Sequence, residues 1–66
     1  MTRTITYGER MAAVREECQW GRVYLPGGGS EEWHTEAERR DSIRIWGDRK
    51  VQRCKPWAYS MFIWLE

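Results

Sequence analysis

The sequence lacks any apolar run that is long enough to cross a membrane. Its longest apolar segment, residues 57–65, has nine residues, whereas a transmembrane helix needs about 20. The first residues, Met1–Thr6, contain no apolar core of the kind that a secretion signal needs. We therefore expect a cytoplasmic protein that does not associate with membranes.

Cysteine and histidine are scarce, with two cysteines and one histidine in the chain. Cys18 and Cys54 form no CxxC pair, and the ligand spacing of a zinc site is missing. In a cytosolic setting we expect both thiols to be reduced and half-buried. His34 would have to meet a nucleophile by chance of folding. These shortages predict no catalytic residues, no metal and no cofactor, so we expect that the protein is not an enzyme.

Glycine is concentrated in one loop, residues 26–30, which holds three of the six glycines. A glycine-rich loop before a helix can bind phosphate, but the lysine of a Walker loop is missing here. Glu31 and Glu32 also occupy the place of the anion, where they would repel a phosphate group. We expect no nucleotide site at this loop.

Tryptophan and arginine are abundant, with five tryptophans in the 66 residues. We expect one small domain, residues 1–66, and a domain of this size buries only about 60% of its unfolded surface. Each aromatic ring can bury roughly 150–250 Å², which is more ring surface than so small a core readily encloses. We therefore predict that self-association buries the remainder, most simply in a twofold homodimer.

The apolar segment 57–65 is the centre of the predicted fold. Pro56 precedes it, and aromatic and branched residues dominate it, which favours a buried strand. A helix with Pro56 at its first position is the alternative. Both faces of such a strand are apolar, as in a central strand or a strand covered by a second chain. We assign to the core or to a dimer interface the residues Trp57, Tyr59, Met61, Phe62, Ile63, Trp64 and Leu65.

Residues 8–19 are predicted to form the main helix. Met11, Val14 and Cys18 recur on one stripe of this segment, as the helical period requires. Thr6 and Glu9 have the spacing of a capping box at its start.

Short alternating segments predict the other strands, which cover residues 22–25, 42–46 and 49–54, with 3–7 as a further edge strand. The two segments beside Gly47-Asp48 are predicted to form a hairpin, through a loop of two or three residues. Together with 57–65 they make a C-terminal three-stranded meander. Segment 31–40, with Ser30 as its cap, is either a thin surface helix or a loop that orders on binding. The expected fold class is α+β, with one main helix packed on a small antiparallel sheet.

Charge is nearly balanced, at +1 overall, but it is unevenly distributed. Residues 1–38 carry four basic and seven acidic side chains, whereas residues 39–57 carry seven basic and two acidic ones. Tryptophan and arginine are the residue types most enriched at binding hot spots. We predict that a partner contacts Trp33, Arg39, Arg40, Arg44, Trp46, Arg49, Lys50 and Arg53.

These features favour a small, non-enzymatic interaction module that docks on a larger protein and modulates or inhibits it. Modules of this size are often encoded by phages or mobile elements, and we expect such an origin. The alternative is a small nucleic-acid-binding protein that uses the basic and aromatic segment 39–57. No helix-turn-helix, zinc-finger or RNP-like motif supports that alternative, so docking on a protein is preferred.

Overall fold

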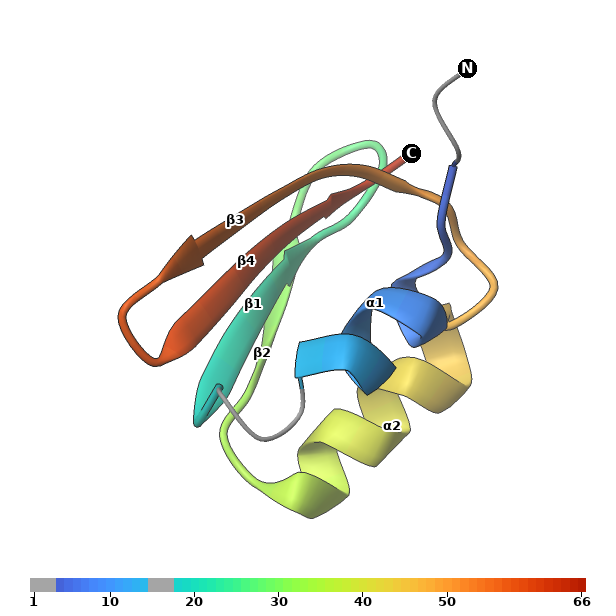
Figure 1. Cartoon of the computed structure of the whole chain (residues 1–66). Helices are drawn as coiled ribbons and strands as arrows, with labels where there is room; N and C mark the ends of the chain where they lie inside the picture. Colours follow the sequence, from blue (N-terminus) through green and yellow to red (C-terminus); the bar gives the residue numbers. More distant parts are fainter. Residues whose placement is uncertain (1–3, 15–17) are drawn as a thin grey trace.

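A computed structural model of the chain describes residues 4–14 and 18–66, which form two helices and a four-stranded mixed sheet (Figure 1). The elements are α1 (Tyr7–Val14), β1 (Trp20–Tyr24), β2 (Ser30–Trp33), α2 (Glu36–Trp46), β3 (Val51–Trp57) and β4 (Ser60–Leu65). The expected α+β class is confirmed, and the expectation of one main helix is replaced by two helices.

The sheet has the strand order β2-β1-β4-β3. Strand β1 is antiparallel to β2 and parallel to β4, and β4 is antiparallel to β3. Parallel neighbours need a long crossover, which the chain between β1 and β4 supplies. Both helices lie on the same side of the sheet, as Figure 1 shows. The expected antiparallel meander is therefore wrong, because β4 pairs with β3 on one side and with the parallel strand β1 on the other.

Residues 42–46 were predicted as a strand, but they form the last part of α2. The helix begins at a capping box, in which the Glu38 amide donates to Thr35 Oγ1 at 3.1 Å. The Glu38 carboxylate in turn accepts from the Thr35 amide at 3.2 Å. A helix that starts here places Ile43 and Trp46 three residues apart, on the side that packs against the core. Apolar and polar residues alternate in 42–46, as in a strand, but the apolar residues Ile43 and Trp46 also have helical spacing. The capping box at Thr35 starts a helix that continues through these residues.

The hairpin expected at Gly47-Asp48 is also wrong, since Gly47 is the C-cap of α2 and its amide donates to the Ile43 carbonyl at 2.7 Å.

Segment 31–40, which was expected to be a helix or a loop, is divided between strand β2 and helix α2. Ser30 begins β2 rather than capping a helix, and the helix starts only after Thr35.

The predicted helix 8–19 is shorter in the structure, where α1 ends at Val14. Its predicted capping box is confirmed, because the Thr6 amide donates to Glu9 Oε1 at 3.1 Å and the Glu9 amide donates to Thr6 Oγ1 at 3.2 Å. Residues 15–17 lie outside the described part, and Cys18 precedes β1. Of the edge strand expected at 3–7, residue 3 lies outside the described part, and residues 4–7 form one isolated bridge, between Thr6 and Lys50.

Strand β4 lies between β1 and β3, so of the two predicted alternatives, a central strand or a strand covered by a second chain, the structure has the central strand. Its alternate residues Met61, Ile63 and Leu65 point to the helices and are buried. The run 57–65 is nevertheless divided by a turn, and Trp57 belongs to β3. The core consists of Tyr7, Met11, Val23, Trp33, Met61, Ile63 and Leu65.

Tyr7 joins the two helices, because its buried hydroxyl forms a hydrogen bond with the Ser42 hydroxyl of α2. Burial raises the pKa of Tyr7 above the usual value for tyrosine, since the ionised phenolate would be poorly solvated there. The native state therefore keeps its proton at a pH where the unfolded chain begins to lose it. Stability from this group is fully present below about pH 10 and falls as the pH rises further.

We expect Tyr7→Phe to lower the free energy of unfolding by about 1 kcal/mol at pH 8, because a part-buried hydrogen bond is lost. Above pH 10 the difference between the two proteins should shrink, since only the wild type has this phenol to ionise. Urea unfolding of both proteins from pH 8 to pH 11 measures this. A difference that stays constant across the range would contradict the proposed role of the Tyr7 proton.

Candidate functional site

The sheet face opposite the helices carries a dense group of aromatic and basic side chains, called here the aromatic face. Its strands are aligned so that Phe62 pairs with Arg22 and Lys55, and Trp64 pairs with Tyr24 and Arg53. Paired residues point to the same side of a sheet. By this register the large side chains of the face are Trp20, Arg22, Tyr24, Glu32, Arg53, Lys55, Trp57, Phe62 and Trp64, and Ser30 and Ser60 lie on the same side. Neither helix covers it, because both lie on the other side (Figure 1).

Trp64 lies between two neighbours at the middle of the aromatic face. Tyr24 stacks on it with a centroid distance of 4.7 Å and an angle of 11° between the rings. The Arg53 guanidinium lies 4.7 Å from the centroid of the Trp64 ring. Tyr24 and Arg53 come from strands on opposite sides of β4, so Trp64 is flanked from both sides. The rings therefore stand upright on the sheet and direct their edges to solvent.

A second cluster lies at the start of β1. Trp20 stacks on His34 with the centroids 5.4 Å apart, and it meets Phe62 edge to face at 5.5 Å. The Glu32 carboxylate lies 2.9 Å from His34 Nε2 and accepts from Arg22 Nε at 2.8 Å. The hydrogen bond to His34, followed by that to Arg22, lowers the pKa of Glu32. At this end, the charge of Arg22 is balanced within the chain.

The β3 half of the aromatic face carries a positive charge that is not balanced. Arg53 contacts the Trp64 ring, and Lys55 follows two residues later on the same face. Within residues 4–14 and 18–66, no carboxylate forms an ion pair with either side chain. With Arg22 and Glu32 balanced, Arg53 and Lys55 leave the face with a local charge of about +2.

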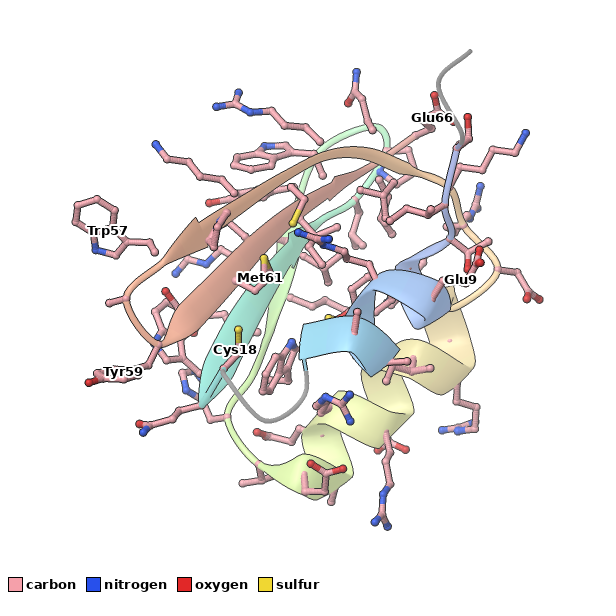
Figure 2. All side chains as sticks on the ribbon, in the orientation of Figure 1. Glu9, Cys18, Trp57, Tyr59, Met61 and Glu66 are labelled. Carbon is pink, nitrogen blue, oxygen red and sulfur yellow. The ribbon has the colours of Figure 1, made fainter. Side chains whose placement is uncertain are left out.

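An open groove of about 410 Å³ is formed on this half of the face. Its lining residues are Lys55, Trp57, Phe62 and Trp64. Trp57 is 68% exposed, which is unusual for a residue of its size. Figure 2 shows Trp57 and Tyr59 projecting outward at the end of the β3–β4 hairpin. The groove thus offers apolar ring surface to solvent beside one ammonium group.

The hairpin turn that holds Trp57 is fixed by two hydrogen bonds. Ser60 Oγ donates to the Trp57 carbonyl at 2.5 Å, and the Gln19 amide donates to the Tyr59 carbonyl at 2.7 Å. The first hydrogen bond lies within the turn, and the second connects the turn to the segment before β1. Trp57 therefore projects from a turn whose backbone is held on both sides.

The eight residues predicted to contact a partner do not form one surface. Trp33 lies in the core at 4% exposure, where its ring occupies the space that a side chain at Gly21 would need. Arg39 is buried as well, and it donates to the Met11 carbonyl at 2.7 Å and to Glu36 at 3.2 Å. These two residues hold the core and the helices together, so a partner cannot reach them in this structure.

The other predicted contact residues are distributed over the molecule. Arg40 and Arg44 lie on the exposed side of α2, and Arg49 and Lys50 lie in the exposed segment between α2 and β3. Trp46 is half-buried and donates to the Glu31 carboxylate at 3.2 Å. These five residues lie off the aromatic face, and Arg53 is the one member of the predicted set that belongs to it.

Five residues of the face belong to neither predicted set, the partner-contact set or the core and dimer set: Trp20, Arg22, Tyr24, Glu32 and Lys55. The alternation of Arg22, Val23 and Tyr24 was visible, but the side on which the helices lie was not. Among the residues assigned to core or dimer interface, the structure separates Met61, Ile63 and Leu65, which are in the core, from Phe62 and Trp64, which are on the aromatic face.

A second hollow, of about 190 Å³, lies between β2 and α2 and is lined by acidic residues. Each of its four carboxylates already has a partner: Glu31 with Trp46, Glu32 with Arg22, Glu38 with Thr35, and Asp41 with Arg44. Within the described residues, no group of three His, Cys, Asp or Glu side chains could hold a metal ion. Cys18 and Cys54 are half-buried, as expected, and they form no disulfide bond in this structure.

Comparison of the chain with family models, with curated proteins and with solved structures gives no match. The described part of the chain has no helix that is both long and apolar enough to span a membrane.

Ala58, at the first position of the β3–β4 turn, has a φ of +54°, where glycine is preferred. We expect Ala58→Gly to raise the free energy of unfolding by about 1 kcal/mol, because the left-handed conformation strains an alanine. For a domain of this size the gain corresponds to roughly 4–8 °C in Tm.

The matched control is Ala12→Gly, at an exposed position of α1, which should instead destabilise the protein by about 1 kcal/mol. Thermal unfolding of the three proteins gives the comparison. A lower Tm for Ala58→Gly would show that the turn does not strain Ala58.

Proposed function

We propose that this chain is a small, non-enzymatic interaction module that docks on a larger protein through its aromatic face and modulates or inhibits that protein. The observation that carries the proposal is the uncovered sheet face, on which five aromatic rings lie together with Arg53 and Lys55. Trp57 is exposed and the other four rings are half-buried, and a group of accessible apolar side chains on one surface is a common mark of an interaction site. Aromatic and arginine side chains are also the usual anchors of protein interfaces.

The arrangement of the rings supports a protein partner over a nucleic acid. Nucleic-acid bases stack on free ring faces. Trp64 is flanked by Tyr24 and Arg53, and Trp20 is stacked on His34, so these faces are already occupied. Upright rings offer edges and gaps instead, into which side chains of a protein can pack.

The two edges of the sheet support docking on the face rather than the addition of another strand. The edge strand β3 contains Lys55 and Pro56 and has an irregular register between Val51 and Arg53. The other edge strand, β2, has four residues, two of which are Glu31 and Glu32. Short, charged, bulged or proline-containing edges disfavour pairing with another chain.

A homodimer remains a prediction of the sequence, with the aromatic face as the surface that a second copy would cover. Face-to-face pairing would bury the exposed rings of both copies. It would also bring together two faces that each carry about +2, which disfavours this arrangement. An origin in a phage or mobile element likewise stays an expectation from size.

Nucleic-acid binding is the second candidate, and one observation favours it. Arg53 and Lys55 lie beside aromatic rings without an ion-pair partner among the described residues, as in surfaces that follow a nucleic-acid backbone. Of the predicted basic segment 39–57, however, Arg40 and Arg44 lie on the outer side of α2 and are paired with Glu36 and Asp41. The basic residues therefore do not form one continuous track.

We expect immobilised wild-type protein to retain a specific protein from a lysate of the source organism, and Trp57→Ala to reduce that retention at least tenfold. A central aromatic anchor typically contributes 2 kcal/mol or more to binding. The measurement is quantitative recovery of the retained protein by mass spectrometry.

The matched control is Ile45→Ala, which removes another exposed apolar side chain, 56% exposed, from α2. It should leave retention unchanged. Equal loss of retention with both variants, or no loss with Trp57→Ala, would exclude the aromatic face as the docking surface.

Light scattering of the purified protein measures its oligomeric state. A solution mass twice that of the chain would identify a second copy as the molecule that covers the aromatic face.

A further inference from the structure

We infer that the groove lined by Lys55, Trp57, Phe62 and Trp64 is the anchor site for an acidic segment of the partner protein, which inserts one aromatic side chain between the rings. The carboxylates that flank this side chain would lie against Lys55 and Arg53. This inference rests on the proposed function, because it specifies which chemistry the aromatic face recognises.

The lining of the groove suits a planar aromatic side chain. The groove's volume of about 410 Å³ is at the lower end of the range for small-molecule pockets. Three of its four lining residues are aromatic, and such rings prefer to contact another ring, edge to face or with an offset. Trp57 is the wall with most free surface, since Phe62 already meets Trp20 and Trp64 already meets Tyr24.

The charge of the groove selects an anionic ligand. Aromatic cages for quaternary ammonium groups have no cation among their walls, whereas this groove contains Lys55. Arg53 lies two residues away on the same strand face and stacks on the Trp64 ring that forms one wall. Neither cation has an ion-pair partner among the described residues, so both can pair with carboxylates of a ligand without breaking an existing ion pair.

The groove is also held in place before a ligand arrives. The turn beside Trp57 is closed by Ser60 and tied to the backbone of Gln19. The opposite walls, Phe62 and Trp64, come from the central strand β4. Walls that are already ordered reduce the entropy that is lost on binding.

Two other occupants fit less well. A second copy of the chain would present the same two unpaired cations, Arg53 and Lys55, to themselves. A single-stranded nucleic acid would find two unpaired cations and one largely free ring face, at Trp57, which is a small footprint for binding by phosphate contacts and stacking. An acidic segment with one aromatic residue satisfies both the charge and the ring surface.

The test uses short synthetic peptides as probes, with NMR spectra of the full-length ¹⁵N-labelled protein as the readout. A peptide Glu-Glu-Phe-Glu-Glu should shift the indole N–H signals of Trp57 and Trp64 and the amide signals of β3 and β4. The dissociation constant should be at least tenfold weaker for Glu-Glu-Ala-Glu-Glu, and Lys-Lys-Phe-Lys-Lys should give no saturable shift. Lys55→Glu should weaken binding of the first peptide at least tenfold.

The charge-matched control is Lys50→Glu, which changes an exposed lysine directly before β3 and should leave the dissociation constant unchanged. Equal binding of the phenylalanine and alanine peptides, or shifts that lie outside β3 and β4, would overturn the inference. Tighter binding of a labelled single-stranded oligonucleotide, at the same salt concentration and with sensitivity to Lys55→Glu, would identify nucleic acid as the occupant and overturn it too.

Failure of the acidic-segment inference can be distinguished from failure of the proposed docking function by comparing two variants in the lysate experiment. If a protein retained from the lysate is lost with Trp57→Ala but not with Lys55→Glu, the aromatic face remains the docking surface and the acidic-segment inference fails. If neither substitution affects retention, the docking surface fails as well.

Discussion

The structure depends on the position of β4 between β1 and β3. This strand alternates Met61, Ile63 and Leu65 with Phe62 and Trp64, so both of its sides are apolar. A central place in the sheet satisfies its backbone hydrogen bonds on both edges, but only one of its two sides is covered by the helices. The uncovered side is the physical origin of the aromatic face.

The chain reduces the cost of this exposed side by packing the aromatic residues on each other. Tyr24 and Arg53 flank Trp64, and His34 lies on Trp20, so large parts of these rings are shielded without a third layer of structure. Trp57 is the exception, because it extends from the hairpin end and remains mostly exposed. The same packing that stabilises the free protein leaves one groove, and this contrast makes the groove the strongest candidate for an anchor.

The charged residues of the aromatic face also differ between its β2 side and its β3 side. On the β2 side, Glu32 balances Arg22 and also contacts His34. On the β3 side, Arg53 and Lys55 have no such partner among the described residues. An uneven surface of this kind disfavours pairing of the face with itself and favours a ligand of opposite charge. The net charge of +1 conceals this difference, because acidic residues elsewhere in the chain offset the local excess.

The sequence by itself determined the α+β class, the capping box of Thr6 and Glu9, and the two-sided apolar character of the C-terminal strand, because these depend on neighbouring residues and on a period of two. The tertiary structure decided that residues 42–46 continue a helix, since the packing of Ile43 and Trp46 against the core outweighs a local alternation. It also decided that Trp33 and Arg39 are buried while Trp20 and Tyr24 are on the open face. Which side of a strand the helices cover depends on contacts between segments distant in the chain, and no local pattern of residues contains that information.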